Sequence, residues 1–360
     1  MTTAKQAKAV ARRWVEEEGA ASIPGFGGVF LHGSINWLPD DAALPANSDV
    51  DVMVVLSDVA DTPGAARRGK FRYGGVLLEV SYLPADAVAS AEQVLGRYDL
   101  AGSFAGAASG VLADPSGRLA ELHAAVSRDY ARRHWVLARC DDARDRVLRN
   151  LAGLDAALRE DLPFHEQVVR WLFAAGVTTH VLLVAGLRNP TVRTRYVAVR
   201  DLLREYGRGD FYESLLGLLD GNGREKLKPG RVAHHVKALA GAFDAAKSAI
   251  QSPFPFAADI SDEARPVAID GSEEMVARGD HREALFWIVA TYSRCLQVLH
   301  ADADSATRER FTPGYRELLA DIGIASSEDL GRRGRQVREH LPGVREVAEA
   351  ILAANPAVVD

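Results

Sequence analysis

The chain has 360 residues, of which 48% are hydrophobic, so it is long enough for two domains that each bury a core. Its formal net charge is −6 and the sequence has no long Lys/Arg tract, which argues against a nucleic-acid partner because such binding needs a basic surface. Cys140 and Cys295 are the only cysteines and are far apart in sequence, so neither a disulfide framework nor a cysteine metal site is indicated.

The N-terminal part of the sequence alternates between helix and strand patterns. Residues 4–18 carry apolar side chains at helical spacing and predict an amphipathic helix. Apolar runs bounded by helix- and strand-breaking residues predict strands over residues 28–32, 50–56, 70–73, 76–83 and 110–113. Gly74 and Gly75, between two of these runs, predict a β-hairpin. Pro84 predicts the first residue of a helix that extends to about Leu95.

After the last predicted strand, Ala/Leu/Arg-rich helical patterns take over. We therefore predict an α+β chain, with a mixed β-sheet and flanking helices over residues 1–125 and an all-α helical bundle over residues 126–360. The helix expected from Phe164 to Leu187 is apolar on nearly every side, which is typical of the central helix of a bundle. Asp161 is expected to cap it, with Pro163 in its first turn.

A Gly-Ser turn follows the first predicted strand. Gly33 permits a left-handed backbone and lets a phosphate approach the main chain, because no Cβ is in the way. Ser34 adds a hydroxyl and an N–H group, which favour an anion at the start of the next element. By itself, this pair is more typical of an ordinary turn at the end of a strand.

Three carboxylates belong to two predicted strands. Asp49 and Asp51 are two residues apart, so they share one face at the head of a buried strand. A hard cation such as Mg²⁺ would relieve their repulsion, whereas the alternative is that both are exposed to water. Glu79 interrupts the apolar run 76–83; it is either an exposed strand residue or the third member of a cluster. Such a cluster can hold metal and accept a proton from an attacking hydroxyl.

In this order and spacing, the Gly33-Ser34 turn, the Asp49/Asp51 pair and Glu79 resemble the signature of the polymerase-beta-like nucleotidyltransferase superfamily. The layout, over about residues 24–120, is similar to that of the aminoglycoside and lincosamide nucleotidyltransferases. The resemblance implies that Gly33 and Ser34 hold the nucleotide phosphates and that Asp49 and Asp51 bind Mg²⁺. It implies that Glu79 is a third metal ligand or the catalytic base. It also implies ATP, or another NTP, as co-substrate, a hydroxyl of a small molecule as acceptor, and pyrophosphate as product.

Residues of the predicted helical domain are candidates for the remaining roles. In kanamycin-type relatives a helix of the C-terminal domain supplies the base, so the resemblance makes Glu166 the candidate if Glu79 serves only the metal. The alternative is that Glu166 stabilises the helix dipole from the first turn. Arg193 and Lys226 lie in two basic clusters that could contact the triphosphate, as cationic clamps do, or could simply be solvated.

Histidines of the same domain are not expected to form a site. His180 lies on the apolar helix and is read as a core histidine. His234 and His235 are adjacent on a predicted helix, so they are expected to point in different directions and not to form a metal pair.

Four functions compete on these observations. The leading hypothesis is a small-molecule nucleotidyltransferase of the antibiotic-modifying kind. The others are the same chemistry on a protein or RNA acceptor, a non-catalytic nucleotide-binding or antitoxin-type module, and a structural protein in which the cluster is a coincidence. The charged start and the lack of an apolar run of about 18 residues predict a soluble, cytoplasmic chain without a membrane partner. Several relatives form dimers, so the resemblance leaves a homodimer open.

Overall fold

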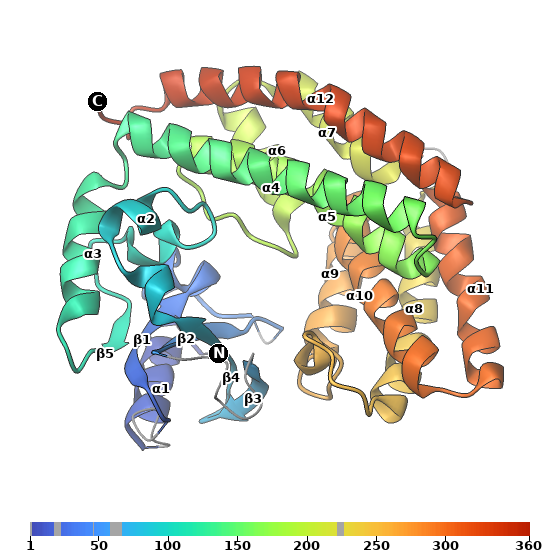
Figure 1. Cartoon of the computed structure of the whole chain (residues 1–360), viewed down its shortest axis with the longest axis horizontal. Coiled ribbons are helices and arrows are strands. Elements are labelled where there is room, and N and C mark those ends of the chain that lie inside the picture. Colours follow the sequence, from blue (N-terminus) through green and yellow to red (C-terminus); the bar gives the residue numbers. More distant parts are fainter. Residues whose placement is uncertain (1, 18–22, 46, 58–66, 222–226) are drawn as a thin grey trace. The chain divides into compact units, whose positions relative to one another are not determined.

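The computed structural model has an α+β architecture, as predicted, with a mixed sheet in the N-terminal half followed by helices (Figure 1). It describes residues 2–17, 23–45, 47–57, 67–221 and 227–360. The chain divides into two compact units. The first unit consists of Met1–Arg139, Ala257–Val267 and Ala357–Asp360. The second consists of Cys140–Phe256 and Ala268–Pro356.

The described residues of the first unit form a five-stranded sheet in the order β3-β4-β2-β1-β5. The strands are β1 (Phe26–His32), β2 (Val50–Leu56), β3 (Arg67–Tyr73), β4 (Val76–Pro84) and β5 (Val111–Ala113). β2 and β4 run parallel, and the other neighbouring pairs run antiparallel. Gly74 and Gly75 have φ angles of +53° and +81° and join β3 to β4 in the predicted hairpin. The five predicted strands are therefore confirmed, with small shifts at their ends.

Apolar side chains cover both faces of this sheet, because alternate strand residues point to opposite sides. On one face, α1 (Ala4–Glu17) buries Trp14 and its small neighbours against β2, β3, β4 and β5. The ring of Trp14 lies 5.6 Å from that of Phe71, measured between centroids. On the other face, Phe30 and Val55 pack against α2 (Ala91–Leu95) and α3 (Arg118–Asp129). The sheet is thus a central layer between two hydrophobic cores.

The prediction that a helix starts at Pro84 is wrong. Pro84 instead ends β4, where it lies opposite Leu56, and a proline without an N–H is tolerated at the end of a strand. A short 3₁₀ turn, η3 (Ala85–Val88), follows. α2 begins only after Ser90, whose hydroxyl accepts a hydrogen bond from the Gln93 N–H at 3.2 Å. The serine N-cap, and not the proline, is therefore the start signal.

The second unit is helical throughout its described elements. After α4 (Arg133–Arg159), which begins in the first unit, come α5 (Phe164–Ala185), α6 (Arg195–Glu205), α7 (Gly209–Asp220), α8 (Pro229–Ala249), α9 (Gly271–Ala277), α10 (His281–Asp302), α11 (Ser305–Asp321) and α12 (Ser327–Ala354). α5 packs against α6, α10 and α12 and is buried along most of its length, so the prediction of a central helix is confirmed. It is also long and apolar enough to cross a membrane, but 83% of its most apolar window is buried, as in a core helix.

The start of α5 differs from the prediction. Pro163, and not Asp161, is the N-cap residue, and no side chain caps this end. Asp161 instead adopts a positive φ of 49° in the preceding turn, a conformation that aspartate tolerates better than most residues. The backbone carbonyl of Pro163 accepts the first hydrogen bond, from the Glu166 N–H at 2.8 Å.

Replacing Trp14 with alanine should lower the free energy of unfolding by about 3–5 kcal/mol, because it empties the space between α1 and the sheet. Urea denaturation followed by circular dichroism measures this change. Glu16→Ala, on the exposed side of the same helix, is the matched control and should change the free energy by less than about 0.5 kcal/mol. Equal effects of the two substitutions would contradict the packing described for α1.

Candidate functional site

Strand pairing brings three carboxylates to one face of the sheet. Asp51 lies opposite Glu79 across β2 and β4. Residues in register project from the same face, and Asp49, two residues before Asp51, shares that face. One ligand oxygen from each of the three lies within 4.8 Å of the other two. The structure therefore brings together the carboxylates that the sequence suggested as a group.

Gly33 lies directly against this group. It starts the turn η2 (Gly33–Asn36) after β1, whose last residue, His32, is paired with Asp51. Its φ is +66°, and a Cβ on it would collide with the Asp51 carboxylate. Glycine is therefore needed both for the backbone conformation and for the space. Ser34 follows in the same turn, and its carbonyl accepts a hydrogen bond from the Trp37 N–H at 3.0 Å.

Lys70 on β3 is a fourth member of the group and was missed in the sequence. Its side chain is only 5% exposed, and its Nζ lies 2.8 Å from Oδ2 of Asp49 and also forms an ion pair with Glu79. A signal for it existed, because the turn at Gly74 and Gly75 sets the hairpin register. Counting back from that turn places Lys70 opposite Glu79, as the structure has it.

Asp259 is a further carboxylate of this group and comes from far along the chain. It ends the short turn η5 (Ala257–Asp259), and its Oδ1 lies 3.4 Å from Nζ of Lys70. The turn packs closely on β3, because Gly69 has no side chain: a Cβ there would collide with Ala258. No local pattern around residue 259 indicates this role, since it arises from tertiary packing alone.

Burial and the surrounding charges set the protonation of these groups. Burial by itself would lower the pKa of Lys70, but the carboxylates of Asp49, Glu79 and Asp259 outweigh it and raise the pKa. Burial would raise the pKa of Asp49, but the Lys70 ammonium lowers it. Burial raises the pKa of Glu79, and the neighbouring carboxylates Asp259 and Asp49 add to this against the opposing effect of Lys70. Lys70 is therefore charged and Asp49 ionised at neutral pH.

The remaining sequence candidates belong to the second unit. Glu166 is half-buried in the first turn of α5, and Arg193 is half-buried just before α6. Lys226 lies outside the described residues. His180 is buried in α5 and its Nε2 lies 2.9 Å from the Thr191 carbonyl, as expected of a core histidine. The triphosphate contacts suggested for Arg193 and Lys226, and the catalytic role suggested for Glu166, stay predictions.

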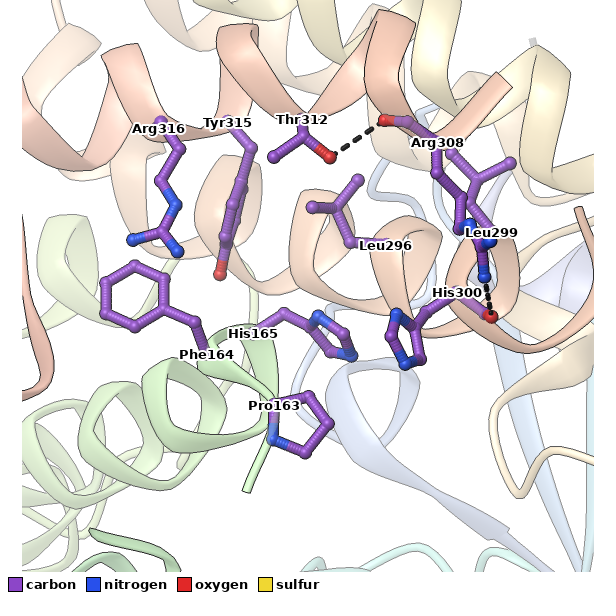
Figure 2. A pocket seen from close by; sticks show the side chains of 10 residues that line it. All are labelled: Pro163, Phe164, His165, Leu296, Leu299, His300, Arg308, Thr312, Tyr315 and Arg316. Carbon is purple, nitrogen blue, oxygen red and sulfur yellow. Dashed lines mark hydrogen bonds between the residues drawn. The ribbon is translucent and has the colours of Figure 1, made fainter. Parts of the chain in front are cut away.

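A cavity of about 220 Å³ lies within the second unit, between the ends of α5, α10 and α11 (Figure 2). The rings of His165 and His300 face each other there, with centroids 5.5 Å apart. The guanidinium of Arg316 covers the ring of Phe164 at 3.8 Å, and Arg308 lies at the other end of the cavity. Burial lowers the pKa of His165 to about 4, so this ring is neutral at neutral pH. Such a lining suits an anionic or aromatic small molecule and not a metal cation.

Replacing Lys70 with methionine should lower the free energy of unfolding by about 3–5 kcal/mol near neutral pH, because it leaves buried carboxylates without their counter-charge. The lowered pKa of Asp49 stabilises the fold above its unfolded value of about 3.9, and this stabilisation is lost as the pH falls further. The raised pKa of Lys70 stabilises the fold below about 10.4, and this is lost as the pH rises through the folded value.

The loss in free energy of unfolding caused by Lys70→Met should therefore be largest between about pH 4 and pH 10. It should shrink in acid, where the carboxylates become protonated. Urea denaturation across this pH range measures it. Lys8→Met, which removes a more exposed ion pair with Asp40, is the control and should cost less than about 1 kcal/mol. A deficit that does not change with pH would mean that Lys70 stabilises the fold by packing and not by charge.

No protein-family model matches this chain, and no curated protein matches it. The chemistry of the residues themselves therefore has to indicate the function.

Proposed function

We propose that the chain is a magnesium-dependent nucleotidyltransferase, which transfers a nucleoside monophosphate to a hydroxyl group of a small molecule and releases pyrophosphate. The proposed donor is ATP, which would supply AMP, and the proposed acceptor class is an aminoglycoside-type antibiotic in the cytoplasm. The observation that carries the proposal is the meeting of Asp49, Asp51 and Glu79 beside the turn at Gly33. Carboxylates that hold a metal next to a backbone that accepts phosphates are what this chemistry requires.

The donor set fits magnesium. Asp49, Asp51 and Glu79 offer oxygen atoms alone, which are the ligands that Mg²⁺ prefers, and Asp49 and Asp51 would hold the ion. The positive charge of Lys70 is shared among Asp49, Glu79 and Asp259. The chemistry that Mg²⁺ supplies when bound is neutralisation of the triphosphate charge around the α-phosphorus.

The residues of the chain have separate tasks in the proposed reaction. Gly33 and Ser34 offer backbone and hydroxyl groups to the phosphates. Lys70 keeps Asp49 ionised, as a metal ligand must be. As the acceptor oxygen bonds to the α-phosphorus, the bond from this phosphorus to the bridging oxygen breaks, and pyrophosphate leaves with the electron pair. The acceptor proton passes to a carboxylate.

Two carboxylates compete for that proton. Burial raises the pKa of Glu79, which makes it a stronger base than a surface glutamate. Its ion pair with Lys70 favours the ionised form that a base needs. Glu166 is the other candidate, from the first turn of α5.

Asp51→Asn should reduce transfer of label from α-³²P-ATP to the acceptor by at least about 100-fold, because the proposed metal ligand is lost while the shape is kept. The assay uses the full chain, Mg²⁺ and a panel of aminoglycosides. Asp86→Asn, an exposed carboxylate of the same unit, is the matched control and should keep full activity. Full activity in Asp51→Asn would refute the proposal. Lack of transfer by the unaltered chain, together with tight binding of ATP and Mg²⁺ in calorimetry, would favour a non-catalytic nucleotide-binding module.

Glu79→Gln and Glu166→Gln should separate the two candidate bases. If Glu79 serves the metal, Glu79→Gln raises the Mg²⁺ concentration that gives half-maximal rate, and Glu166→Gln lowers kcat by about 100-fold without that rise. If Glu79 is the base, Glu79→Gln lowers kcat and Glu166→Gln leaves it unchanged. Initial rates over a range of Mg²⁺ concentrations measure both quantities. Unchanged kinetics in both variants would mean that neither carboxylate accepts the proton.

A further inference from the structure

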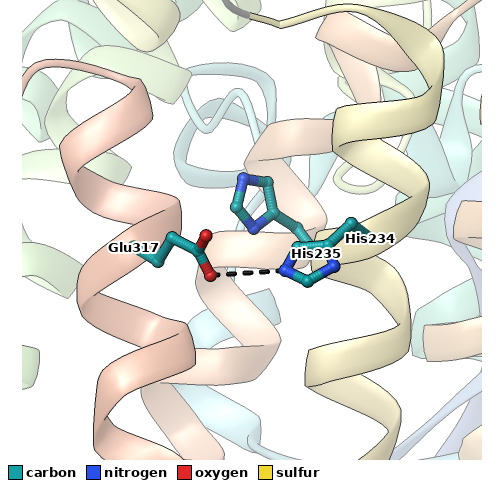
Figure 3. A group of neighbouring side chains, drawn as sticks. All are labelled: His234, His235 and Glu317. Carbon is teal, nitrogen blue, oxygen red and sulfur yellow. Dashed lines mark hydrogen bonds and ion pairs between the residues drawn. The ribbon is translucent and has the colours of Figure 1, made fainter.

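Two helices of the second unit bring histidines and carboxylates together away from the acidic group of the first unit. α8 supplies His234 and His235, and α11, which packs against it, supplies Glu317 (Figure 3). One ligand atom from each lies within 4.8 Å of the other two. The side chain of His235 is fully buried, whereas those of His234 and Glu317 are 53% and 42% exposed. The histidines thus differ in burial, as expected for neighbours on a helix, yet both reach Glu317.

The two nitrogens of His235 have different surroundings. Nε2 lies 2.8 Å from Oδ2 of Asp321, so an ionised Asp321 accepts a hydrogen bond from the Nε2–H. Nδ1 is buried and has no hydrogen-bond partner among the described residues. Figure 3 shows a nitrogen of this ring turned toward the Glu317 carboxylate. A carboxylate that fixes the tautomer of a histidine and frees its other nitrogen as a ligand is a recurrent partner of metal-bound histidines.

The two carboxylate oxygens of Glu317 contact different residues. Oε2 lies 3.3 Å from Nε2 of His234. Oε1 lies 2.9 Å from Nη2 of Arg231, which also forms an ion pair with Asp321. Arg231 therefore holds both carboxylates from one side and leaves Oε2 of Glu317 facing the histidines. It also balances part of their charge.

We propose that His234, His235 and Glu317 form a binding site for a zinc-class divalent transition-metal ion. Zinc binds imidazole nitrogen and carboxylate oxygen at about 2.0–2.2 Å, which puts neighbouring ligand atoms of a tetrahedral site about 3.3 Å apart. The atoms of His234 and Glu317 already have this separation, and the other pairs need to close by at most about 1.5 Å. The exposure of His234 and Glu317 leaves the fourth position open to water or to a ligand.

Zinc suits this site, and magnesium suits the acidic group of the first unit, because the donor atoms differ. Imidazole nitrogen favours zinc and its neighbours in the periodic table, whereas Mg²⁺ demands oxygen ligands and keeps several waters. The inference does not rest on the proposed nucleotidyltransferase activity, since no residue is shared between the two groups. A metal bound here would link α8 to α11 and stabilise the folded second unit.

Calorimetric titration of the chelator-treated full chain with Zn²⁺, in excess Mg²⁺ to occupy the acidic group, tests the site. We expect one zinc per chain with a Kd at or below about 1 μM, and at least about 10-fold weaker binding in His234→Ala and in Glu317→Gln. His134→Ala, which removes an exposed histidine elsewhere, is the matched control and should bind zinc as before. Asp51→Asn should also keep this binding, because it alters only the acidic group.

Two further measurements make the outcome decisive. Zinc should raise the Tm of the unaltered chain but not that of His234→Ala, and diffraction at the zinc edge should show the ion between α8 and α11. Circular dichroism checks that each variant is folded; His234 is exposed enough for its replacement to be tolerated. Equal zinc binding in His234→Ala and the unaltered chain, or no zinc binding in excess Mg²⁺, would overturn the proposal.

Discussion

The ion cluster around Lys70 is the interaction on which the first unit depends. Carboxylates at the edge of a buried sheet repel one another and lose hydration, so they need a counter-charge in the fold itself. Lys70 supplies it, because β3 places its ammonium group among Asp49, Glu79 and Asp259. The same constraint makes the group useful. The carboxylates that Lys70 pairs with belong to the proposed magnesium site, so stability and the proposed metal binding draw on the same atoms.

Local patterns were sufficient for most elements of the fold. The strands and the α+β class follow from apolar runs, from the Gly74-Gly75 turn and from the shift to helical spacing. The errors lie at element starts. Pro84 ends a strand, and α2 begins after Ser90. Asp161 lies in the turn before α5 and does not cap this helix. In each case two residues of types that favour a helix start lie close together in the sequence.

The candidate site was only partly visible in the sequence. Asp49, Asp51 and Glu79 could be grouped because neighbouring strands align residues in pairs, and Gly33 because a turn follows the first strand. Lys70 could have been found by the same register argument. Asp259 could not have been found, since its ion pair with Lys70 depends on packing between segments that are about 190 residues apart in the sequence. The convergence of His234 and His235 on Glu317 was missed for a similar reason, because it depends on the packing of α11 against α8.

The position of Asp259 in the sequence has a consequence for biosynthesis. A ribosome releases the five strands of the sheet long before it reaches the turn at residues 257–259. Until that turn emerges, Lys70 lacks its ion pair with Asp259, and β3 lacks the contact that Ala258 makes beside Gly69. The first unit therefore gains Asp259 and the contact with Ala258 only after α4–α8 of the second unit have been synthesised. A segment translated among the helices thus completes the ion cluster of a sheet that was translated first.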